Sequence, residues 1–333
     1  MSTALYDVVA IGNAIVDVLA QADDGFIAEQ GMAKGSMQLM GSSEEADALY
    51  AKMGPGREIS GGSAANTVAA VAAMGGTAGF IGQVADDQLG QVFAHDIRAA
   101  GVAFNTPVRD GEPATARCLI LVTPDGQRTM NTFLGASQFL PAVAIDEDLI
   151  RAGNILYLEG YLWDPEEPRA AMRRAIEVAR EAGRTVAFTL SDVFCIARHG
   201  DDFRKLIADK QIDLLFANEA ELIALAQVDD LEAAIEKIAP QLPALVVTRS
   251  EHGALATYQG IRYGVSAQPV ETVVDTTGAG DLFAAGVLYG LSQGQSLDRC
   301  LAVGAICAAE VISHYGARPE ADLKQFVMER FQA

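Results

Sequence analysis

The chain has 333 residues, half of them hydrophobic, and is therefore long enough to bury a large core. Its 24 basic and 44 acidic residues give a net charge of −20, which repels nucleic acids and anionic membrane surfaces. No apolar stretch reaches the roughly 18 residues of a membrane span, and the N-terminus shows no basic region or cleavage site. We therefore expect a cytoplasmic protein without a nucleic-acid or membrane partner.

The first apolar run, YDVVAIG at residues 6–12, ends in glycine and is typical of a central parallel strand. Asn13 and Asp17 follow it, where the ligand-binding edge of an open α/β sheet would lie. An ionised aspartate only accepts hydrogen bonds, so Asp17 suits two neighbouring hydroxyls such as those of a ribose. A turn or solvated aspartate explains the same residue equally well.

Short β segments come next. We predict a helix at 24–29 and strands at 35–40, 57–60, 104–108, 116–123 and 128–133, separated by turn signals such as Pro124-Asp125-Gly126. These strands interrupt the alternation of helix and strand. We therefore expect a small β-sheet lid over the site, formed by segments near 17–40, 57–60 and 104–133.

Residues 61–75, GGSAANTVAAVAAMG, combine a glycine pair with a helix of small residues. Gly61 and Gly62 allow a ligand to approach the backbone closely, and Asn66 can both donate to and accept from a hydroxyl. A tight turn into a buried helix would explain the alanines, but it does not require Asn66.

From residue 154 the chain alternates regularly between strand and helix, which predicts a doubly wound, mostly parallel sheet flanked by helices. No linker or repeat divides the chain, so we expect a single α/β domain over 1–333. Asn218, Glu219 and Glu221 follow the strand at 213–217 and lie at the ligand edge of the sheet. Acidic residues there commonly complement a helix N-terminus.

The segment 274–291, VDTTGAGDLFAAGVLYGL, predicts a short strand, a glycine-rich turn and a helix. The amides of Gly278, Ala279 and Gly280 can surround an anion at the positive end of the helix dipole. Asp281 would be repelled by that anion, so it either caps the helix or serves as a general base. A P-loop and a His-Arg-Asp catalytic loop are both absent from the sequence.

The string from Asp275 to Gly286, together with residues 61–75, resembles the two signatures of the ribokinase-like (PfkB) kinases of sugars and nucleosides. The resemblance extends from Gly12 to Pro319. It implies a ribokinase-like fold and transfer of the ATP γ-phosphoryl group to an alcohol with Mg²⁺. It also implies that Asp281 is the base, that the amides of 278–280 form the anion hole and that Arg128 clamps the γ-phosphate.

By the same resemblance, the Asn-x-x-Glu motif from Asn218 to Glu221 organises Mg²⁺ and its waters, and Thr248 and Thr277 contact the nucleotide. Asp275 and Thr277 are candidates for a K⁺ site. Thr248-Arg249-Ser250 departs from the more usual Thr-x-Gly, so the contacts beyond Thr248 do not carry over.

The adenosine kinase branch fits best, because GNAIVD, DDGF, GSMQL and TLSDVF resemble its motifs. This implies ribose contacts from Asn13, Asp17, Gly61, Gly62 and Asn66, and apolar walls for a purine from Met37, Leu39, Leu162 and Phe194. Met37 stands where the branch commonly has a polar contact, so the base itself is not specified.

Two alternatives stay open: a sugar kinase for ribose, fructose or a related alcohol, and a non-catalytic nucleotide-binding regulator, which should have lost the base. No basic cluster for a second phosphate stands out in the sequence, which disfavours sugar phosphates as acceptors. A monomer and a homodimer formed through the lid are both compatible with the sequence.

Overall fold

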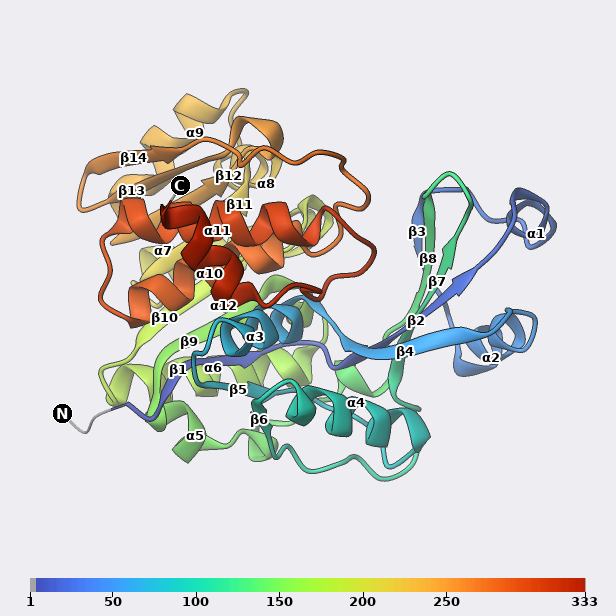
Figure 1. Ribbon diagram of the computed structural model, residues 1–333. Coiled ribbons are helices and arrows are strands. Elements are labelled where there is room, and N and C mark those ends of the chain that lie inside the picture. Colours follow the sequence, from blue (N-terminus) through green and yellow to red (C-terminus); the bar gives the residue numbers. More distant parts are fainter. Residues whose placement is uncertain (1–3, 333) are drawn as a thin grey trace.

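The computed structural model describes residues 4–332, which form two β-sheets and the helices around them (Figure 1). The larger sheet has nine strands in the order β14-β13-β12-β11-β10-β9-β1-β5-β6. All neighbouring strands from β12 to β6 pair in parallel, and the hairpin β13–β14 is added antiparallel at one edge. The strands are β1 (Tyr6–Ile11), β5 (Ala78–Ile81), β6 (Val102–Phe104), β9 (Gly153–Glu159), β10 (Thr185–Thr189), β11 (Leu214–Asn218), β12 (Ala244–Thr248), β13 (Ala254–Tyr258) and β14 (Ile261–Val265).

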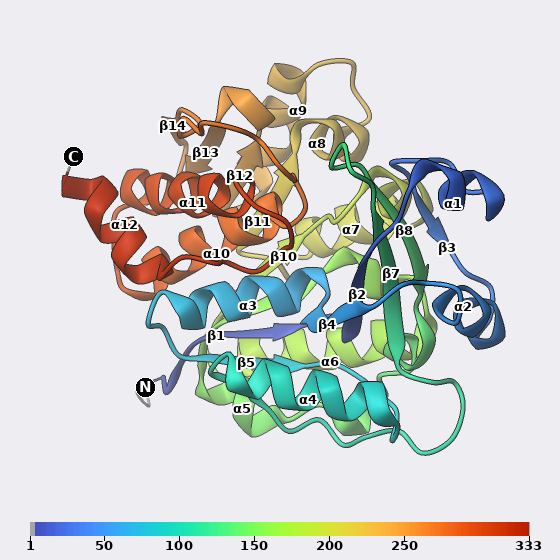
Figure 2. The ribbon, with the colours of Figure 1, turned by 45° about the vertical axis from the view of Figure 1, so that its right-hand side comes forward.

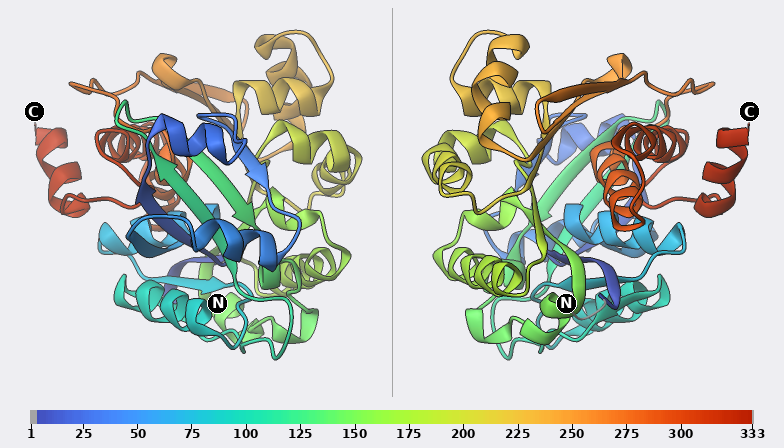
Figure 3. Two further views of the ribbon diagram at one scale, coloured as in Figure 1. Left: turned by 90° about the vertical axis from the view of Figure 1, so that its right-hand side faces the viewer. Right: turned by 90° about the vertical axis from the view of Figure 1, so that its left-hand side faces the viewer.

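Helices cover both faces of this sheet, as the two opposite views in Figure 3 show. Side chains of β1 alternate between the faces: Val8 and Ala10 belong to one hydrophobic cluster, and Val9 and Ile11 to the other. The first cluster includes residues of α3 (Ser63–Ala73), α4 (Gln88–Ala99), α10 (Ala279–Ser292), α11 (Leu297–Val311) and α12 (Leu323–Gln332). The second includes residues of α5 (Glu147–Ala152), α6 (Glu166–Glu181), α7 (Val193–Ala208), α8 (Glu219–Ala226) and α9 (Leu231–Ile238). The expected doubly wound fold is thereby confirmed.

The smaller sheet has five strands in the order β3-β8-β7-β2-β4. It stands beside one end of the larger sheet, and α1 (Asp24–Glu29) and α2 (Ser43–Tyr50) lie on its far side (Figures 1 and 2). Val16 and Val18 are buried in the hydrophobic cluster that contains Leu49 of α2, whereas Ile15 and Asp17 point to the opposite face, toward the larger sheet. The strands are β2 (Ile15–Gln21), β3 (Met37–Leu39), β4 (Gly56–Gly61), β7 (Ala116–Val122) and β8 (Arg128–Phe133).

Two predicted strands were wrong, and two helices were missed. The strand expected at 104–108 is β6, which ends at Phe104 and pairs with β5 in the larger sheet. The strand expected before the glycine-rich turn is absent, because residues 266–276 beyond β14 join no described ladder. Val274 instead donates its backbone N–H to the carbonyl of Ile312, at 2.8 Å. Helices α2 and α4 were not predicted. None of the helices in the described range is long and apolar enough to cross a membrane.

Candidate active site

A cleft of about 390 Å³ lies between the two sheets. On one side are the carboxyl ends of the parallel strands, where ligands bind in open α/β sheets. On the other side is the inner face of the smaller sheet. The larger sheet and the loops after its strands contribute Tyr157, Tyr161, Thr189, Ser191, Asn218 and Thr248; the smaller sheet contributes Ile15, Asp17, Cys118, Ile120, Met130 and Thr132; and the segments around α3 and α10 contribute Gly62, Ser63, Asn66, Thr277, Gly278, Gly280 and Asp281.

Asp281 lies in the first turn of α10 and is held by two side chains of α3. The hydroxyl of Ser63 donates to Oδ1 at 2.6 Å, and Nδ2 of Asn66 donates to Oδ2 at 3.1 Å. Burial raises the pKa of Asp281, and the two hydrogen bonds oppose that rise because they stabilise the charged form. The result is a fixed carboxylate with an elevated pKa inside the cleft, which are the properties of a general base.

Gly278 sets the start of α10. Its φ of 79° is left-handed, and a Cβ atom built on it would lie 2.8 Å from Ala317. The backbone N–H groups of the first helical turn have no intrahelical partners and lie at the positive end of the helix dipole. The Ala279 N–H already donates to the Thr276 carbonyl at 3.2 Å, so the N–H groups of Gly278 and Gly280, which line the cleft, are the donors left for an anion beside Asp281. Gly280 itself lies at the cleft, and a Cβ there would meet nothing within 4 Å.

Asp17 lies in β2, on the face of the small sheet that lines the cleft. Gly61 is the neighbour that makes room for it, because a Cβ on Gly61 would collide with the Asp17 carboxylate. Burial raises the pKa of Asp17 to about 7, with Arg318 and Arg128 acting against the rise. Asp17 and Asp281 are thus two carboxylates in one cleft, which the sequence placed 264 positions apart.

Gly62 lines the cleft, whereas Asn13 is buried beside it and is not part of the lining. Glu159, which the sequence did not single out, accepts hydrogen bonds from the Asn13 backbone at 2.6 Å, the Asn13 side chain at 2.8 Å and the Ala64 backbone at 2.8 Å. Gly62 has a φ of 98°, and a side chain there would strike the Asn13 carbonyl. Burial raises the pKa of Glu159 to about 7. This network ties the end of β1 to the start of α3.

Asn218 and Glu221 form a reciprocal capping box at the start of α8. The Asn218 side chain accepts from the Glu221 backbone N–H at 2.8 Å, and Glu221 accepts from the Asn218 backbone at 2.9 Å and from its side chain at 2.6 Å. Glu221 is buried, which raises its pKa to about 7. Both residues also line the cleft.

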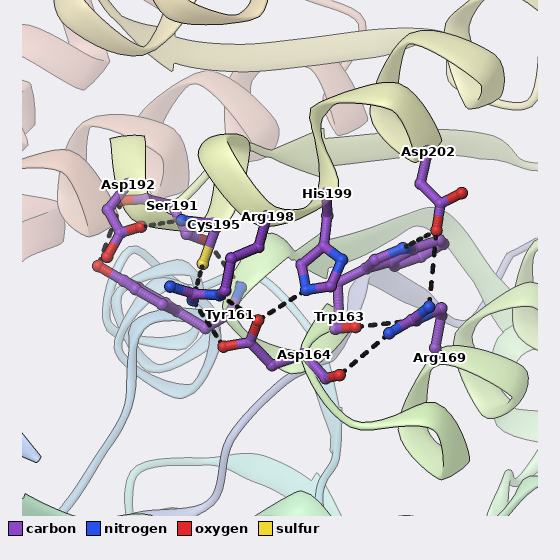
Figure 4. Close-up of polar contacts among 10 residues, drawn as sticks. All are labelled: Tyr161, Trp163, Asp164, Arg169, Ser191, Asp192, Cys195, Arg198, His199 and Asp202. Carbon is purple, nitrogen blue, oxygen red and sulfur yellow. Dashed lines mark hydrogen bonds and ion pairs between the residues drawn. The ribbon is translucent and has the colours of Figure 1, made fainter.

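Tyr161 is an aromatic wall of the cleft that the sequence analysis missed. It is held by Ser191, a non-glycine residue with a φ of 72°. The Ser191 hydroxyl accepts from the Tyr161 backbone at 3.1 Å, and the Tyr161 hydroxyl donates to the Ser191 carbonyl at 3.2 Å (Figure 4). A strained serine that fixes a ring at the cleft indicates a position built for a ligand.

Four residues expected to form apolar walls lie outside the cleft lining. Leu162 is fully buried among the side chains between the sheet and α6 and α7, because in the turn after β9 only Tyr161 faces the cleft. Phe194, at the start of α7, has 67% of its surface exposed. Met37 and Leu39 are half or more exposed on β3, the edge strand of the smaller sheet.

Arg128 lines a cavity of about 60 Å³ that adjoins the cleft, because Asp17, Asn66 and Thr277 line both. Its guanidinium contacts Asp275, with Nη2 2.7 Å from Oδ2. Arg57 and Arg318 line the same cavity, together with Asp17. No basic cluster stands out in the sequence, because the three arginines come from β4, β8 and the segment before α12, and only folding brings them together.

A buried, hydrogen-bonded carboxylate at a helix N-terminus, with a second carboxylate in the same cleft, is an arrangement compatible with phosphoryl transfer to an alcohol. The chain belongs to the pfkB family of carbohydrate kinases, whose model matches residues 36–323. It is a kinase, and its acceptor is a sugar or a nucleoside.

Known proteins resemble the chain over nearly its full length. The structure of an adenosine kinase from Sinorhizobium meliloti is 46% identical, covers 98% of this chain and 99% of its own, and superimposes with a TM-score of 0.89. That of a probable sugar kinase from Rhizobium etli is 42% identical, covers 99% and 100%, and has a TM-score of 0.92. An ATP-dependent ribose-1-phosphate kinase from Halopiger xanaduensis is 34% identical over 83% of this chain and 88% of its own. These relatives share the family and differ in acceptor.

Proposed function

We propose that the protein transfers the γ-phosphoryl group of ATP to the 5′-hydroxyl of a ribonucleoside, and that adenosine is its acceptor. The observation that carries this proposal is that Asp281 and Asp17 both line one cleft, whose remaining walls include Ile15, Ile120 and Tyr161. A ribose needs a carboxylate for its paired hydroxyls, and a purine needs apolar and aromatic surface. The similarity to an adenosine kinase at 46% identity supports the same acceptor.

In this mechanism Asp281 takes the proton of the acceptor hydroxyl while the hydroxyl oxygen attacks the γ-phosphorus, and the bond from that phosphorus to the β,γ-bridging oxygen breaks to release ADP. Ser63 and Asn66 hold the carboxylate in place, so little reorganisation is needed when the proton moves. The amides of Gly278 and Gly280 stabilise the negative charge on the transferring group. Closure of the smaller sheet over the cleft would exclude water and suppress hydrolysis of ATP.

ATP and Mg²⁺ would lie toward Thr248, Thr277 and the Asn218–Glu221 box, which line the other half of the cleft. No group of three or more His, Cys, Asp or Glu side chains that could hold a metal occurs among residues 4–332. A single carboxylate nevertheless fits Mg²⁺, which keeps several waters and binds substrate phosphates. When bound, the ion would neutralise phosphate charge, and Glu221 would hold its waters.

A phosphorylated pentose is the second candidate acceptor. The cavity lined by Arg57, Arg128 and Arg318 adjoins Asp17, so an acceptor whose hydroxyls bind Asp17 could place a phosphate toward these arginines. The similarity to a ribose-1-phosphate kinase at 34% identity favours the same class. The net charge of −20 does not oppose it, since the arginines act locally.

Adenosine analogues test the proposed geometry. With Mg-ATP, adenosine should give 5′-AMP, identified by the coupling of its phosphorus to the 5′ protons in ³¹P spectra. 5′-Deoxyadenosine should compete with adenosine without turnover. 2′-Deoxyadenosine should lose about tenfold or more in kcat/KM, because one hydrogen bond to buried Asp17 is missing. Equal kcat/KM for adenosine and 2′-deoxyadenosine, or phosphate on another hydroxyl, contradicts the proposal.

A further inference from the structure

The ion pair between Arg128 and Asp275 connects the smaller sheet to the segment that leads into the anion-binding turn. Arg128 begins β8 in the smaller sheet, and Asp275 precedes the turn at 276–278. Nη2 of Arg128 lies 2.7 Å from Oδ2 of Asp275, and the two side chains are only 6% and 5% exposed. The guanidinium also lies 5.9 Å from the ring centre of Tyr315. The ion pair is therefore buried, and removing either residue would leave the other charge buried and unpaired.

Both oxygens of the Asp275 carboxylate already have partners within the protein. Oδ2 lies 2.7 Å from Nη2 of Arg128 and accepts the backbone N–H of Gly316 at 3.0 Å, and Oδ1 accepts the backbone N–H of Thr277 at 3.0 Å. These bonds join the turn at 276–278 to the loop at 315–317, on which Gly278 packs. A bound cation would need some of the same oxygens and would be repelled by the guanidinium. The residues that suggested a K⁺ site thus do not fit one.

We propose that the Arg128 guanidinium supplies the positive charge beside the anion-binding turn, so that the kinase works without a monovalent cation and acquires a cation requirement when Arg128 is removed. The charge is needed because an unpaired carboxylate buried next to the phosphate site would repel the phosphate and pull on the turn. The inference rests on phosphotransfer at residues 278–281 and not on the identity of the acceptor.

The first test compares initial rates in tetramethylammonium, sodium and potassium chloride at equal ionic strength. Wild-type rates should agree within about twofold, since exposed charges respond to ionic strength and not to the cation. Arg128→Met should lose most of its activity in tetramethylammonium and regain at least about tenfold in potassium or sodium, because the freed carboxylate can take a cation. Arg128→Lys, which keeps a charge, should show no cation requirement.

Arg117→Met is the matched control. Arg117 is another buried arginine of the smaller sheet, in β7, but it pairs with Asp47 of α2 at 2.6 Å. Its removal should leave the rates equally insensitive to the cation. A double variant, Arg128→Met with Asp275→Asn, should also show no rescue, because the carboxylate that would hold the cation is gone.

A second readout requires no acceptor. Potassium should raise the melting temperature of Arg128→Met and leave that of the wild type unchanged, because a ligand stabilises only a state that binds it. Failure of the adenosine assignment would leave this measurement standing. A wild-type enzyme activated more than about fivefold by potassium, or an Arg128→Met variant whose melting temperature responds to no cation, overturns the inference.

Discussion

Replacing Asp281 by asparagine tests the assigned base with little disturbance of the fold. The new amide keeps one oxygen for the Ser63 hydroxyl, which now donates at 2.6 Å. Its NH₂ group would face Nδ2 of Asn66, but Oδ1 of Asn66 is buried and has no hydrogen-bond partner in the described part of the chain. Turning the Asn66 amide over would pair that oxygen with the new NH₂. We therefore expect a folded protein with an unchanged melting temperature.

The expected loss falls on kcat. A positioned general base contributes about 10²- to 10⁴-fold, which corresponds to roughly 2.7–5.4 kcal/mol of barrier. The KM values for ATP and for the acceptor should change little, because the anion hole and Asp17 are untouched. The acid limb of the pH profile should also disappear, since the titrating carboxylate is gone. Initial rates of ADP release, measured at varied concentrations of Mg-ATP and of acceptor and at varied pH, give kcat, both KM values and the pH profile.

Asp298→Asn is the control for this variant. Asp298 stands in the first turn of α11 and is exposed, so it has the same relation to its helix as Asp281 has to α10 but lies outside the cleft lining. It should retain wild-type kcat. If Asp281→Asn keeps its melting temperature and its kcat stays within about tenfold of wild type, Asp281 is not the base.

Three further variants probe the surroundings of Asp281. Ser63→Ala removes a hydrogen bond that lowers the pKa of Asp281. Because the base must be ionised, activity falls as the pH drops through that pKa, so the acid limb of kcat should move up by about one pH unit. An acid limb that does not move argues against Asp281 as the titrating group. Asp17→Ala should raise the acceptor KM at least about tenfold, and an unchanged KM and kcat/KM would exclude the ribose contact. Gly278→Ala should lower the free energy of unfolding by about 1–3 kcal/mol in denaturant titrations, because φ is 79° and the new Cβ would crowd Ala317. A variant as stable as the wild type would show that the turn is not constrained.

The features that sequence reasoning predicted are local ones. The glycine-rich turn at 278–280 could be located because glycines before an apolar helix are a short-range signal. The parallel strands were predictable because their continuous apolar runs are buried on both faces. The carboxyl edge of the sheet then placed Asn218 and Thr248 near one another, and the structure brings both to the cleft.

The features it missed depend on contacts distant in sequence. No residue close to Arg128 in the sequence indicates that its partner is Asp275, or that Arg57 and Arg318 line the same cavity. Side-chain direction was equally inaccessible: Tyr161 and Leu162 are consecutive and both apolar enough for a binding wall, yet only the turn geometry decides which one faces the cleft. An apolar pattern shows that residues are buried, without showing whether a core or a ligand covers them.

The central claim, phosphorylation of a nucleoside, is tested most directly by the acceptor itself. Initial rates of ADP release with Mg-ATP should be measured against adenosine, other nucleosides, ribose, fructose, ribose 1-phosphate and no acceptor. The account predicts the highest kcat/KM for adenosine and near-background rates for the free sugars. A higher kcat/KM for ribose 1-phosphate or a free sugar than for adenosine would contradict the nucleoside assignment. The protein would then be a sugar kinase that uses the same catalytic residues.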